Sequence, residues 1–453
     1  MSIREKNVKR YVISSIQNDS SINQEFFDTL KSFTTRKSAK LMLLPTKYMG
    51  DKSSATWDKS LQKYIVNAEV EIGSNIKVLG DLYLLATLDN PISGFDTISK
   101  GKTVIVGHAQ YQMKFLTSSD TTRPIMLTST GSVTVPNVNA NTKVGKKAIF
   151  NHSFSALYLS VVNEGQPNEE FHIRNLNWDG AGFYDVDGYY SGQNKFQGAK
   201  IEAIVTGDEH VSEISKDVFE CTYGKNGIVE TLRPNYIIRH DVLDFNSASH
   251  HAKGKLVIQN NLERDGTNDI KKELDETASF ILQTTPKDTK TFIVASNHNE
   301  HLDRWLEDPD SNLDKKNAKL YHWLMLEKYK PENAGFSAFE IYFRYQFKDT
   351  DRVLFLDRND PEYIYDIEVH QHGDKAGNGV RGSIQLFSKH TQKTIIGHSH
   401  TPGVDKGCYQ VGTSSKLRMS YNSGMSSWGN SHVLIYNNGK RQHIHIVNGK
   451  WFV

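Results

Sequence analysis

The segment KIEAIVTGDEH, residues 200–210, carries the most informative pattern in the chain. Its first seven residues are mostly apolar and include β-branched side chains, which is typical of a buried strand. Asp208 and His210, two residue types that bind metals, come at the end of this segment. Side chains at positions i and i+2 of extended backbone point to the same face, so we expect Asp208 and His210 to reach one site together.

The same arrangement recurs four more times toward the C-terminus, because each of four further apolar runs ends in Asp, Asn or His. The runs Tyr236–Ile238, Thr291–Ala295, Tyr363–Val369 and Thr394–Ile396 are followed by Asp241, by Asn297-His298, by His372 and by His398-Ser-His400. The carboxyl ends of the strands of an α/β sheet line one crevice. We therefore expect these side chains to converge on one site.

Stretches of helical spacing, such as Asp269–Leu282, alternate with the strand-like runs, which indicates the α/β class. Two domains are predicted. Residues 1–195 would form an N-terminal α/β domain for substrate binding or assembly, and residues 196–453 a catalytic domain.

The N-terminal half opens as strand, helix and strand, at Tyr11–Ile16, Asn23–Phe33 and Leu41–Pro45. No internal repeat is visible between the two halves. Gly107-His108-Ala109-Gln110 mimics the motif around His398 but lacks the second His and any neighbouring partner motif. A structural role is therefore predicted for His108.

The composition excludes several classes of protein. No run approaches 18 uninterrupted apolar residues, so we expect no membrane span, and the N-terminus lacks the apolar core of a secretory signal. Only Cys221 and Cys408 are present, which favours a reducing, cytoplasmic compartment. Lys and Arg number 54 against 52 Asp and Glu, a net charge of +2, so a nucleic-acid partner would need local basic patches or bound cations.

The residue types at the five strand ends predict a metal site. Carboxylate, amide oxygen and imidazole together suit Mn²⁺, Fe²⁺ or Zn²⁺ rather than Ca²⁺, which prefers oxygen ligands alone. One Zn²⁺ would need only three or four ligands, and more than that are available here. We therefore predict two divalent metal ions and favour Mn²⁺. Two such ions side by side can activate a water molecule and hold a phosphate between them.

These motifs together resemble the five ordered motifs of the calcineurin-like metallophosphoesterase superfamily. The motifs are Gly207-Asp208-Glu-His210, Asp241-Val-Leu-Asp244, Asn297-His298, His372-Gly373 and Gly397-His398-Ser-His400. The resemblance covers the chain from about residue 200 to the C-terminus. It implies a layered β-sandwich with flanking helices.

The resemblance also implies a role for each residue. Asp208, His210 and His400 would hold the first metal, and Asp241 would bridge to the second. The second metal would be held by Asn297, His372 and His398. His298 would act as general acid, or stabilise the transition state, beside the scissile phosphate.

Three positions depart from the family pattern. His240 stands where a Gly usually precedes the Asp of the second motif. Ser296 also replaces a Gly, which would strain the backbone if the position needs a glycine conformation. Asn299 replaces an acidic residue that could orient His298, and Glu300 lies near enough in sequence to substitute for it.

Within the superfamily, the chain resembles the DNA-cleaving branch, and in particular the early DNA-transfer proteins of tailed phages, which are similar to double-strand-break repair nucleases. This implies a metal-dependent DNase that acts on host DNA in the host cytoplasm, with DNA as its partner. A nucleotide or phosphoprotein phosphatase, and a non-catalytic scaffold with a decayed metal site, remain alternatives. A homo-oligomer is left open.

Several other polar residues allow a simpler interpretation. Arg381, in the Gly-rich segment Gly373–Gly382, could meet a DNA phosphate, although a plain flexible loop explains it as well. His250 and His251 are typical of a solvated loop. His370 shares a face with His372, and we favour His372 as the ligand because Gly373 follows it as in the family. His301 is expected to begin a helix.

Overall fold

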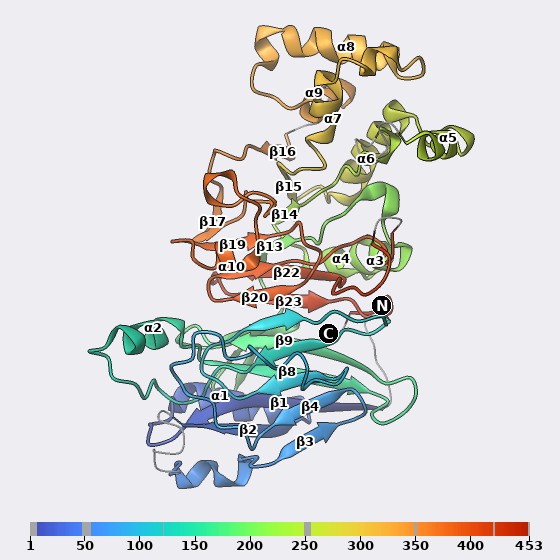
Figure 1. The fold of residues 1–453 in the computed structure, drawn as a ribbon. Helices are drawn as coiled ribbons and strands as arrows, with labels where there is room; N and C mark the ends of the chain where they lie inside the picture. The colour runs from blue at the N-terminus through green and yellow to red at the C-terminus, as the bar shows by residue number, and fades with distance from the viewer. Residues whose placement is uncertain are drawn as a thin grey trace.

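The computed structural model describes residues 7–47, 56–120, 122–248, 255–347, 351–419 and 422–451. The expected loop residues His250 and His251 lie outside these ranges. The described residues form a mixed α/β structure with four sheets and flanking helices (Figure 1). No helix among them has the length and apolar composition needed to cross a bilayer.

A six-stranded sheet organises the C-terminal half, in the order β16-β15-β14-β13-β22-β23. Its strands are β13 (Ile201–Val205), β14 (Tyr236–Arg239), β15 (Lys290–Val294), β16 (Val353–Leu356), β22 (Ser431–Tyr436) and β23 (Arg441–His445). The first four are parallel, and β22 and β23 are antiparallel. The parallel strands are short and almost wholly apolar because both faces of the sheet are covered.

Most helices of this half connect the parallel strands of this sheet, and the last two come after its fourth parallel strand. The helices are α3 (Lys216–Tyr223), α4 (Ile228–Leu232), α5 (Leu256–Arg264), α6 (Ile270–Thr284), α7 (His301–Glu307), α8 (Ala318–Tyr329), α9 (Ala338–Gln346) and α10 (Ile384–Phe387), with one-turn 3₁₀ helices η3 (Val211–Glu213), η4 (Asn246–Ala248), η6 (Ser311–Leu313), η7 (Pro331–Asn333) and η8 (Gly377–Gly379). Helix α6 begins after Asp269, whose side chain accepts from the backbone N–H of Lys272. Helices α7 to α9 form the projection at the top of Figure 1.

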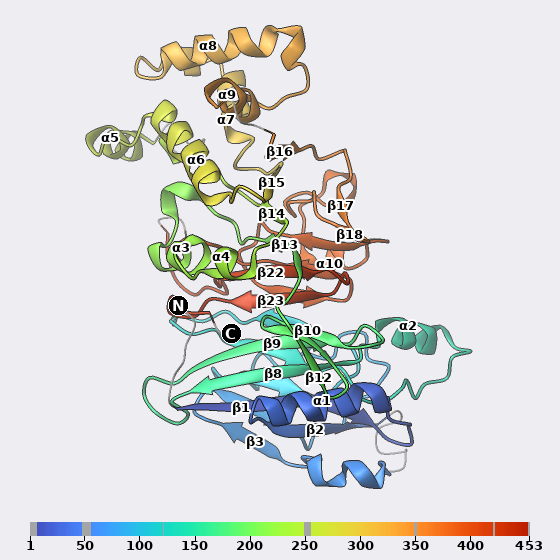
Figure 2. The same ribbon diagram turned by 180° about the vertical axis from the view of Figure 1, so that it is seen from behind.

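The N-terminal half contains a four-stranded sheet in the order β2-β1-β8-β9. Its elements are β1 (Val8–Gln17), β2 (Lys40–Thr46), β8 (Ser155–Val162), β9 (Glu170–Asn177), the helices α1 (Gln24–Arg36) and α2 (Lys143–Asn151), and the 3₁₀ helix η2 (Lys59–Tyr64). Helix α1 lies across the outer face of this sheet (Figure 2), where Phe26, Leu30 and Phe33 pack on Val12 and Ile16. A small sheet follows, with β10 (Phe183–Asp185), β11 (Gly188–Ser191) and β12 (Asn194–Gln197).

One ten-stranded sheet runs through both halves, in the order β17-β18-β19-β21-β20-β6-β7-β5-β4-β3. The strands are β3 (Glu69–Ile72), β4 (Ile76–Leu79), β5 (Thr103–Val106), β6 (Met113–Phe115), β7 (Met126–Ser129), β17 (Tyr363–Ile364), β18 (Ile367–Glu368), β19 (Lys393–Ile396), β20 (Gly403–Asp405) and β21 (Cys408–Gln410). Strand β6 of the N-terminal half pairs antiparallel with β20 of the C-terminal half. Strand pairing therefore crosses the predicted domain boundary at residue 195.

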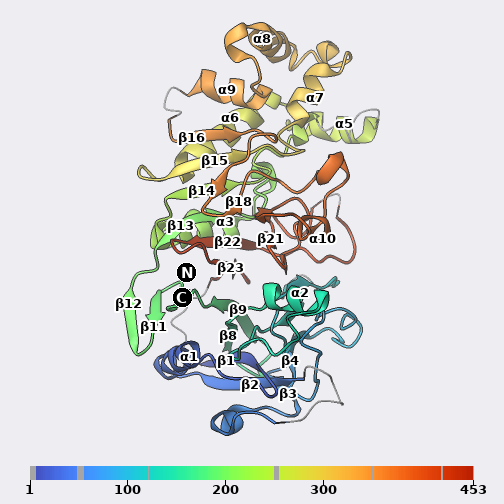
Figure 3. The ribbon, with the colours of Figure 1, turned by 90° about the vertical axis from the view of Figure 1, so that its left-hand side faces the viewer.

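The largest hydrophobic core lies between this long sheet and the other two large sheets. It includes Ile13 and Leu159 of the four-stranded sheet and Val205 and Val433 of the six-stranded sheet. The ten-stranded sheet contributes residues from both of its ends to the same core, including Ile72 of β3 and Ile364 of β17. Strands β9 and β23, which are edge strands of the four-stranded and six-stranded sheets, lie side by side (Figure 3), so the two halves share one continuous sandwich.

The two halves repeat the same strand topology. In the N-terminal half, β1 pairs parallel with β2 and antiparallel with β8, and β8 pairs antiparallel with β9. In the C-terminal half, β13 pairs in the same way with β14 and β22, and β22 pairs in the same way with β23. The order β3-β4-β5-β7-β6 likewise matches β17-β18-β19-β21-β20, with the same parallel and antiparallel pairs.

Backbone hydrogen bonds also show which single residues of the two halves occupy equivalent positions. The N–H of Ser15 donates to the carbonyl of Gly131 at 3.0 Å, and the N–H of Asp208 donates to the carbonyl of Gly412 at 3.1 Å. The halves therefore contain a repeat that the sequence did not reveal, because strand pairing preserves topology while the side chains differ.

Most predicted elements are present with small shifts of their ends. The helix expected at Asn23–Phe33 is α1, with Asn23 as its N-cap. The single strand expected at Tyr363–Val369 is wrong, because the chain forms the hairpin of β17 and β18 instead. Tyr365, at the turn, has a φ of 57°, which a continuous strand does not allow.

Candidate metal centre

The structure brings Asp, Asn and His residues from five separate strand ends into one buried cluster. Potential ligand atoms fall into four overlapping groups, and the atoms of each group lie within 4.8 Å of one another. The groups are Asp208, His210, Asp241 and His400; Asp208, His240 and His372; His210, Asp244 and His298; and Asp241, His372 and His398.

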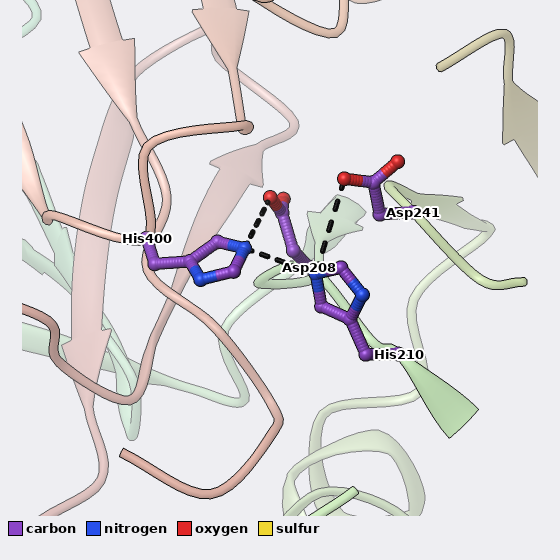
Figure 4. Close-up of side chains that lie close together, drawn as sticks. All are labelled: Asp208, His210, Asp241 and His400. Atoms are coloured by element: carbon purple, nitrogen blue, oxygen red, sulfur yellow. Dashed lines mark hydrogen bonds and ion pairs between the residues drawn. The ribbon is translucent and has the colours of Figure 1, made fainter. Parts of the chain in front are cut away.

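Figure 4 shows the first group, in which the side chains of Asp208, His210, Asp241 and His400 point toward one another. His400 Nε2 lies 3.1 Å from Asp208 Oδ2 and 3.0 Å from His210 Nε2. His210 Nε2 lies 3.9 Å from Asp241 Oδ2. Asp208, His210 and Asp241 are almost fully buried and His400 is 5% exposed, so these polar atoms face each other and not bulk water.

Asp241 belongs to a second group as well. Its Oδ2 lies 3.0 Å from His372 Nε2, in the group that also contains His398. His398 Nδ1 lies 3.1 Å from the side-chain oxygen of Asn297. Asp241 is thus shared by two sets of candidate ligands.

Four residues of the cluster have a left-handed backbone conformation. The φ angles are 40° at His210, 41° at Asp241, 72° at His398 and 58° at His400. Such conformations are costly for residues with a Cβ and persist where surrounding structure imposes them, which is common at functional sites. Here they turn the side chains of successive loop residues inward.

Gly397 leaves the space that the cluster needs. A Cβ at this position would lie 2.3 Å from Asp208 Oδ1 and 3.0 Å from the ring of His240. Both neighbours are buried and cannot move aside. Only glycine therefore allows the loop before His398 to pass this close to Asp208.

The carboxyl groups of the cluster are held in their charged form. Burial raises the pKa of Asp208 and of Asp241, but hydrogen bonds and charges from His400 and His372 outweigh it and lower both. Burial is likewise outweighed at Asp244, where hydrogen bonds from His210 and His298 lower the pKa. Three carboxylates therefore concentrate negative charge among buried side chains.

The imidazoles divide into two kinds. Burial lowers the pKa of His240 to about 4 and lowers those of His398 and His400, so these rings are neutral and can offer a lone pair. At His298 burial also lowers the pKa, but the charges of Asp241 and Asp244 outweigh it and raise the value to about 9. Asp241 raises the pKa of His372 against burial in the same way.

The cluster fits divalent cations on two grounds. Its donors are carboxylate oxygens and imidazole nitrogens, the set that suits Mn²⁺, Fe²⁺ or Zn²⁺. In addition, Asp208 belongs to two of the four groups, and its Oδ1 is buried and has no hydrogen-bond partner. Buried polar atoms are normally satisfied, so an unused carboxylate oxygen among these donors indicates a missing partner, and a cation would supply it.

His298 lies at the open side of the cluster, with 22% of its side chain exposed. Its Nδ1 lies 3.0 Å from the backbone carbonyl of Asp244 and 3.4 Å from the Asp244 carboxylate. Asp244 therefore orients the ring. The expected substitute Glu300 is engaged elsewhere, since it pairs with Arg358 and lies 3.5 Å from Lys375.

Two of the three departures from the family pattern, Ser296 and Asn299, also have structural explanations. Ser296 has no left-handed φ, so the anticipated backbone strain is absent at this residue. Asn299 is buried and structural: its side chain accepts from the N–H of Leu243 and donates to the carbonyl of Val294.

Sequence reasoning did not assign two members of the cluster. Asp244 stood inside the second motif, three residues after Asp241, and its position there was the available signal. His240 was noted only as a departure, yet its Nδ1 lies 3.3 Å from His372 Nδ1. No sequence pattern pointed to Trp428, whose ring centroid lies 4.2 Å from that of His400.

The sequence also singles out His370, His301 and Arg381. His370 lies beside Glu368 and Gln371 and is not a member of the four groups, whereas His372 is. His301 begins α7, as expected, and its ring packs against His298. Arg381 is exposed on the loop after His372 and stays a predicted substrate contact.

Among the described residues of the N-terminal half, the repeat places no comparable cluster. Matching the hydrogen-bonded strands sets Ser15 at the position of Asp208, His108 at that of His398 and Gln110 at that of His400. Both ring nitrogens of His108 are used, by the carbonyl of Leu85 at 3.1 Å and the N–H of Gln110 at 3.0 Å. The structural role predicted for His108 agrees with these contacts.

No protein-family model matches the chain. The chain is similar to Protein A1 of Escherichia phage T5, with 29% identity over 472 aligned residues that cover 99% of this chain and 83% of the phage protein. A phage origin is consistent with this similarity.

Proposed function

We propose that the protein is a metal-dependent DNase of the calcineurin-like metallophosphoesterase type, and that the cluster in the C-terminal half is its active site. The single observation that carries the proposal is the convergence of Asp208, Asp241, His372 and His400 from four strand ends into one buried, negatively charged space. The match of these residues to the ordered motifs of that superfamily supports a phosphoester substrate.

The four groups suggest how two cations would be held. Asp208, His210 and His400 would bind the first, Asn297, His372 and His398 the second, and Asp241 would bridge them. When bound, two such cations would activate water and offset the charge of the phosphodiester. Asp241 raises the pKa of His372 in the metal-free protein, so a cation would compete with a proton for this ring.

His298 would then provide the proton that the leaving oxygen needs. Its Nδ1 is engaged by Asp244, which leaves Nε2 directed away from that partner. In the metal-free protein the charges of Asp241 and Asp244 raise the pKa of this ring to about 9, and Asp244 would still contact the ring when Asp241 holds the cations. A charged donor beside the scissile bond stabilises the developing negative charge.

The proposal assigns catalysis to residues 196–453 and a supporting role to residues 1–195, with DNA in the host cytoplasm as substrate. The matched positions Ser15 and Gln110 in the N-terminal half lack the side chains that the cluster uses. The N-terminal half would therefore be a non-catalytic copy of the catalytic one.

Incubation of the protein with linear and circular duplex DNA, with and without Mn²⁺, tests the proposal when the products are sized. We expect Mn²⁺-dependent cleavage in the wild type and loss of about 10³-fold or more in Asp241→Asn and His298→Ala, from the usual magnitudes of metal and general-acid contributions. Metal analysis should find fewer bound ions in Asp241→Asn and an unchanged number in His298→Ala.

Matched controls sharpen this test. His108→Gln alters the residue at the position of His398 and should keep full activity, whereas His398→Gln should lose most of it. Hydrolysis of p-nitrophenyl phosphate without cleavage of DNA would indicate a phosphatase instead. A wild-type protein that binds well under two metal equivalents and cleaves neither substrate would contradict the proposal.

A further inference from the structure

We propose that a pocket between the two halves, next to His400, binds an unpaired nucleotide of the DNA strand that is cleaved. This inference rests on the proposed function and names the form of its substrate. The pocket has a volume of about 440 Å³. Ligand sites of small molecules span roughly 300–1,000 Å³, so one nucleotide fits while a duplex does not.

Both halves build the walls of this pocket. From the N-terminal half, Phe115 at the end of β6 and residues 122–124 before β7 line the pocket. The C-terminal half contributes the start of α3, residues 416–418 and 428–430, and the end of β23. The N-terminal half thus takes part in the site even though it lacks the metal ligands.

Positive charge prevails in the pocket. Arg123, Lys416 and Arg418 line it against one carboxylate, Asp217. The Arg418 guanidinium donates to the backbone carbonyls of Ser119 and Gly424, which are neutral acceptors. Its charge is thus available to a phosphate while the side chain is held in place.

The other two cationic side chains, Lys416 and Arg123, form ion pairs that are exposed to solvent. Lys416 Nζ lies 3.1 Å from Glu213, but 60% of the lysine side chain is exposed. Arg123 Nε lies 3.5 Å from Asp120, and 44% of each side chain is exposed. Solvent-exposed pairs contribute little, so an incoming phosphate can compete for both cations.

Aromatic rings connect the pocket to the metal centre. Trp428 lines the pocket and contacts His400, with ring centroids 4.2 Å apart. A single ring therefore separates the pocket from a candidate metal ligand. Phe115 and His445 also line the pocket with their rings 5.3 Å apart, and His445 Nδ1 is buried without a hydrogen-bond partner.

Cationic side chains together with aromatic rings are the combination that binds single-stranded nucleic acid. Phosphates meet the cations, and bases stack on the rings. The small net charge of the chain, +2, does not oppose this, because three cationic side chains line the pocket itself.

A second pocket on the other side of the cluster has the opposite charge. It has a volume of about 720 Å³ and is lined by Asp244 and His298 together with α5 and α6. Two lysines, Lys255 and Lys272, face five carboxylates there, those of Glu213, Asp244, Asp269, Glu273 and Glu276. An anionic strand would be repelled from it, so we assign the strand to the basic pocket.

Binding of a fluorescein-labelled 12-nucleotide single strand by the full chain tests this inference. The Asp241→Asn background prevents cleavage, so the readout does not depend on catalysis. We expect Arg123→Gln with Lys416→Gln to weaken binding about tenfold. The slope of log Kd against the logarithm of the salt concentration should decrease by about 1.4, because each lost phosphate contact removes about 0.7 from it.

Lys255→Gln with Lys272→Gln removes two cations from the acidic pocket and is the matched control, for which we expect unchanged affinity. Both double variants, made without Asp241→Asn, should hydrolyse bis(p-nitrophenyl) phosphate as the wild type does, since that small diester needs the metal centre alone. The wild-type chain should bind the single strand more tightly than a 12-base-pair duplex.

Equal affinities of both double variants would overturn the inference, and so would tighter binding of the duplex. Loss of bis(p-nitrophenyl) phosphate hydrolysis in the Arg123 and Lys416 variant would also overturn it, because the change would then act through the metal centre. If the wild type cleaves nothing but the binding results hold, the proposed function fails and the strand-binding pocket stands.

Discussion

The contact between Asp244 and His298 decides the chemistry available at the edge of the cluster. Asp244 is 3% exposed and approaches His298 and His210 together. Its carboxylate holds the His210 ring through Nδ1 at 3.0 Å, which directs His210 Nε2 to Asp208 and Asp241. A carboxylate behind a candidate metal-binding histidine fixes the tautomer and strengthens the ligand.

We predict that His298 titrates near pH 9 in the metal-free protein, against about 6.5 for an isolated imidazole. Asp244→Asn should lower this pKa toward 6.5, because one of the two neighbouring negative charges is removed. Titration of the ring protons by nuclear magnetic resonance measures it directly.

Addition of Zn²⁺ should also lower the pKa of His298, since a bound cation offsets the charge of Asp241. A value near 6.5 in the metal-free wild type would contradict the prediction, and so would a value that Asp244→Asn leaves unchanged.

At the residue scale, the structure places Asp208 and His210 together, as the sequence predicts, but the physical reason behind that prediction is incomplete. The prediction used the alternation of side chains in a strand, but β13 ends at Val205 and His210 has a left-handed conformation. Local turns, not strand alternation, aim His210, His398 and His400. Left-handed turns at residues other than glycine depend on tertiary contacts, so the sequence offered no sign of them.

At the element scale, a buried ion pair joins the ends of β13 and β14. Arg239 and Glu209 are both fully buried, and Arg239 donates to both oxygens of Glu209 at 2.9 and 3.2 Å. Each is a neighbour in sequence of a cluster residue, Asp208 or His240. The pair therefore fixes the two strand ends that carry Asp208 and Asp241.

We predict that Arg239→Met lowers the free energy of unfolding by about 3–5 kcal/mol, because it leaves the Glu209 charge buried and unpaired. Burial already raises the pKa of Glu209 despite Arg239. Glu209→Gln combined with Arg239→Met should recover part of the loss. Urea unfolding of the two single variants and the double variant measures the coupling.

A loss below about 1 kcal/mol in Arg239→Met would show that the pair is dispensable. Lys271→Met, which breaks an exposed pair with Asp275, is the control for loss of an ion pair on the surface.

At the scale of the whole molecule, neutral histidines lie where the halves meet. His172 is on β9, and His443 and His445 are on β23, the two strands that lie side by side between the sheets. Burial lowers the pKa of His172 to about 3 and that of His443 to about 4, and it lowers the pKa of His445 as well. These rings stay uncharged in the folded protein at moderately acid pH.

We predict that acid weakens this junction. The unfolded chain takes up a proton at each histidine below about pH 6.5 and the folded chain does not, so stability is complete above pH 6.5 and falls as the pH drops toward 4. The loss should be about 2 kcal/mol per histidine at pH 5 relative to pH 7.5.

Urea unfolding of the wild type and of His443→Gln, each at pH 7.5 and at pH 5, tests this prediction. The difference between the two proteins isolates the contribution of His443, because titration of the metal centre affects both proteins alike. The variant should lose about 2 kcal/mol less than the wild type between pH 7.5 and 5. Identical losses in the two proteins would contradict the prediction.

The sequence by itself determined the α/β class, the order of most strands and helices, and the candidate ligands, because apolar periodicity and residue type are local properties. Only the tertiary structure decided that the halves repeat one topology, that a single sheet crosses between them, and that His240 and Asp244 join the cluster. Strand pairing depends on backbone hydrogen bonds between residues far apart in the chain, and different side chains satisfy the same pairing. The repeat and the pocket between the halves therefore leave no mark in a linear pattern.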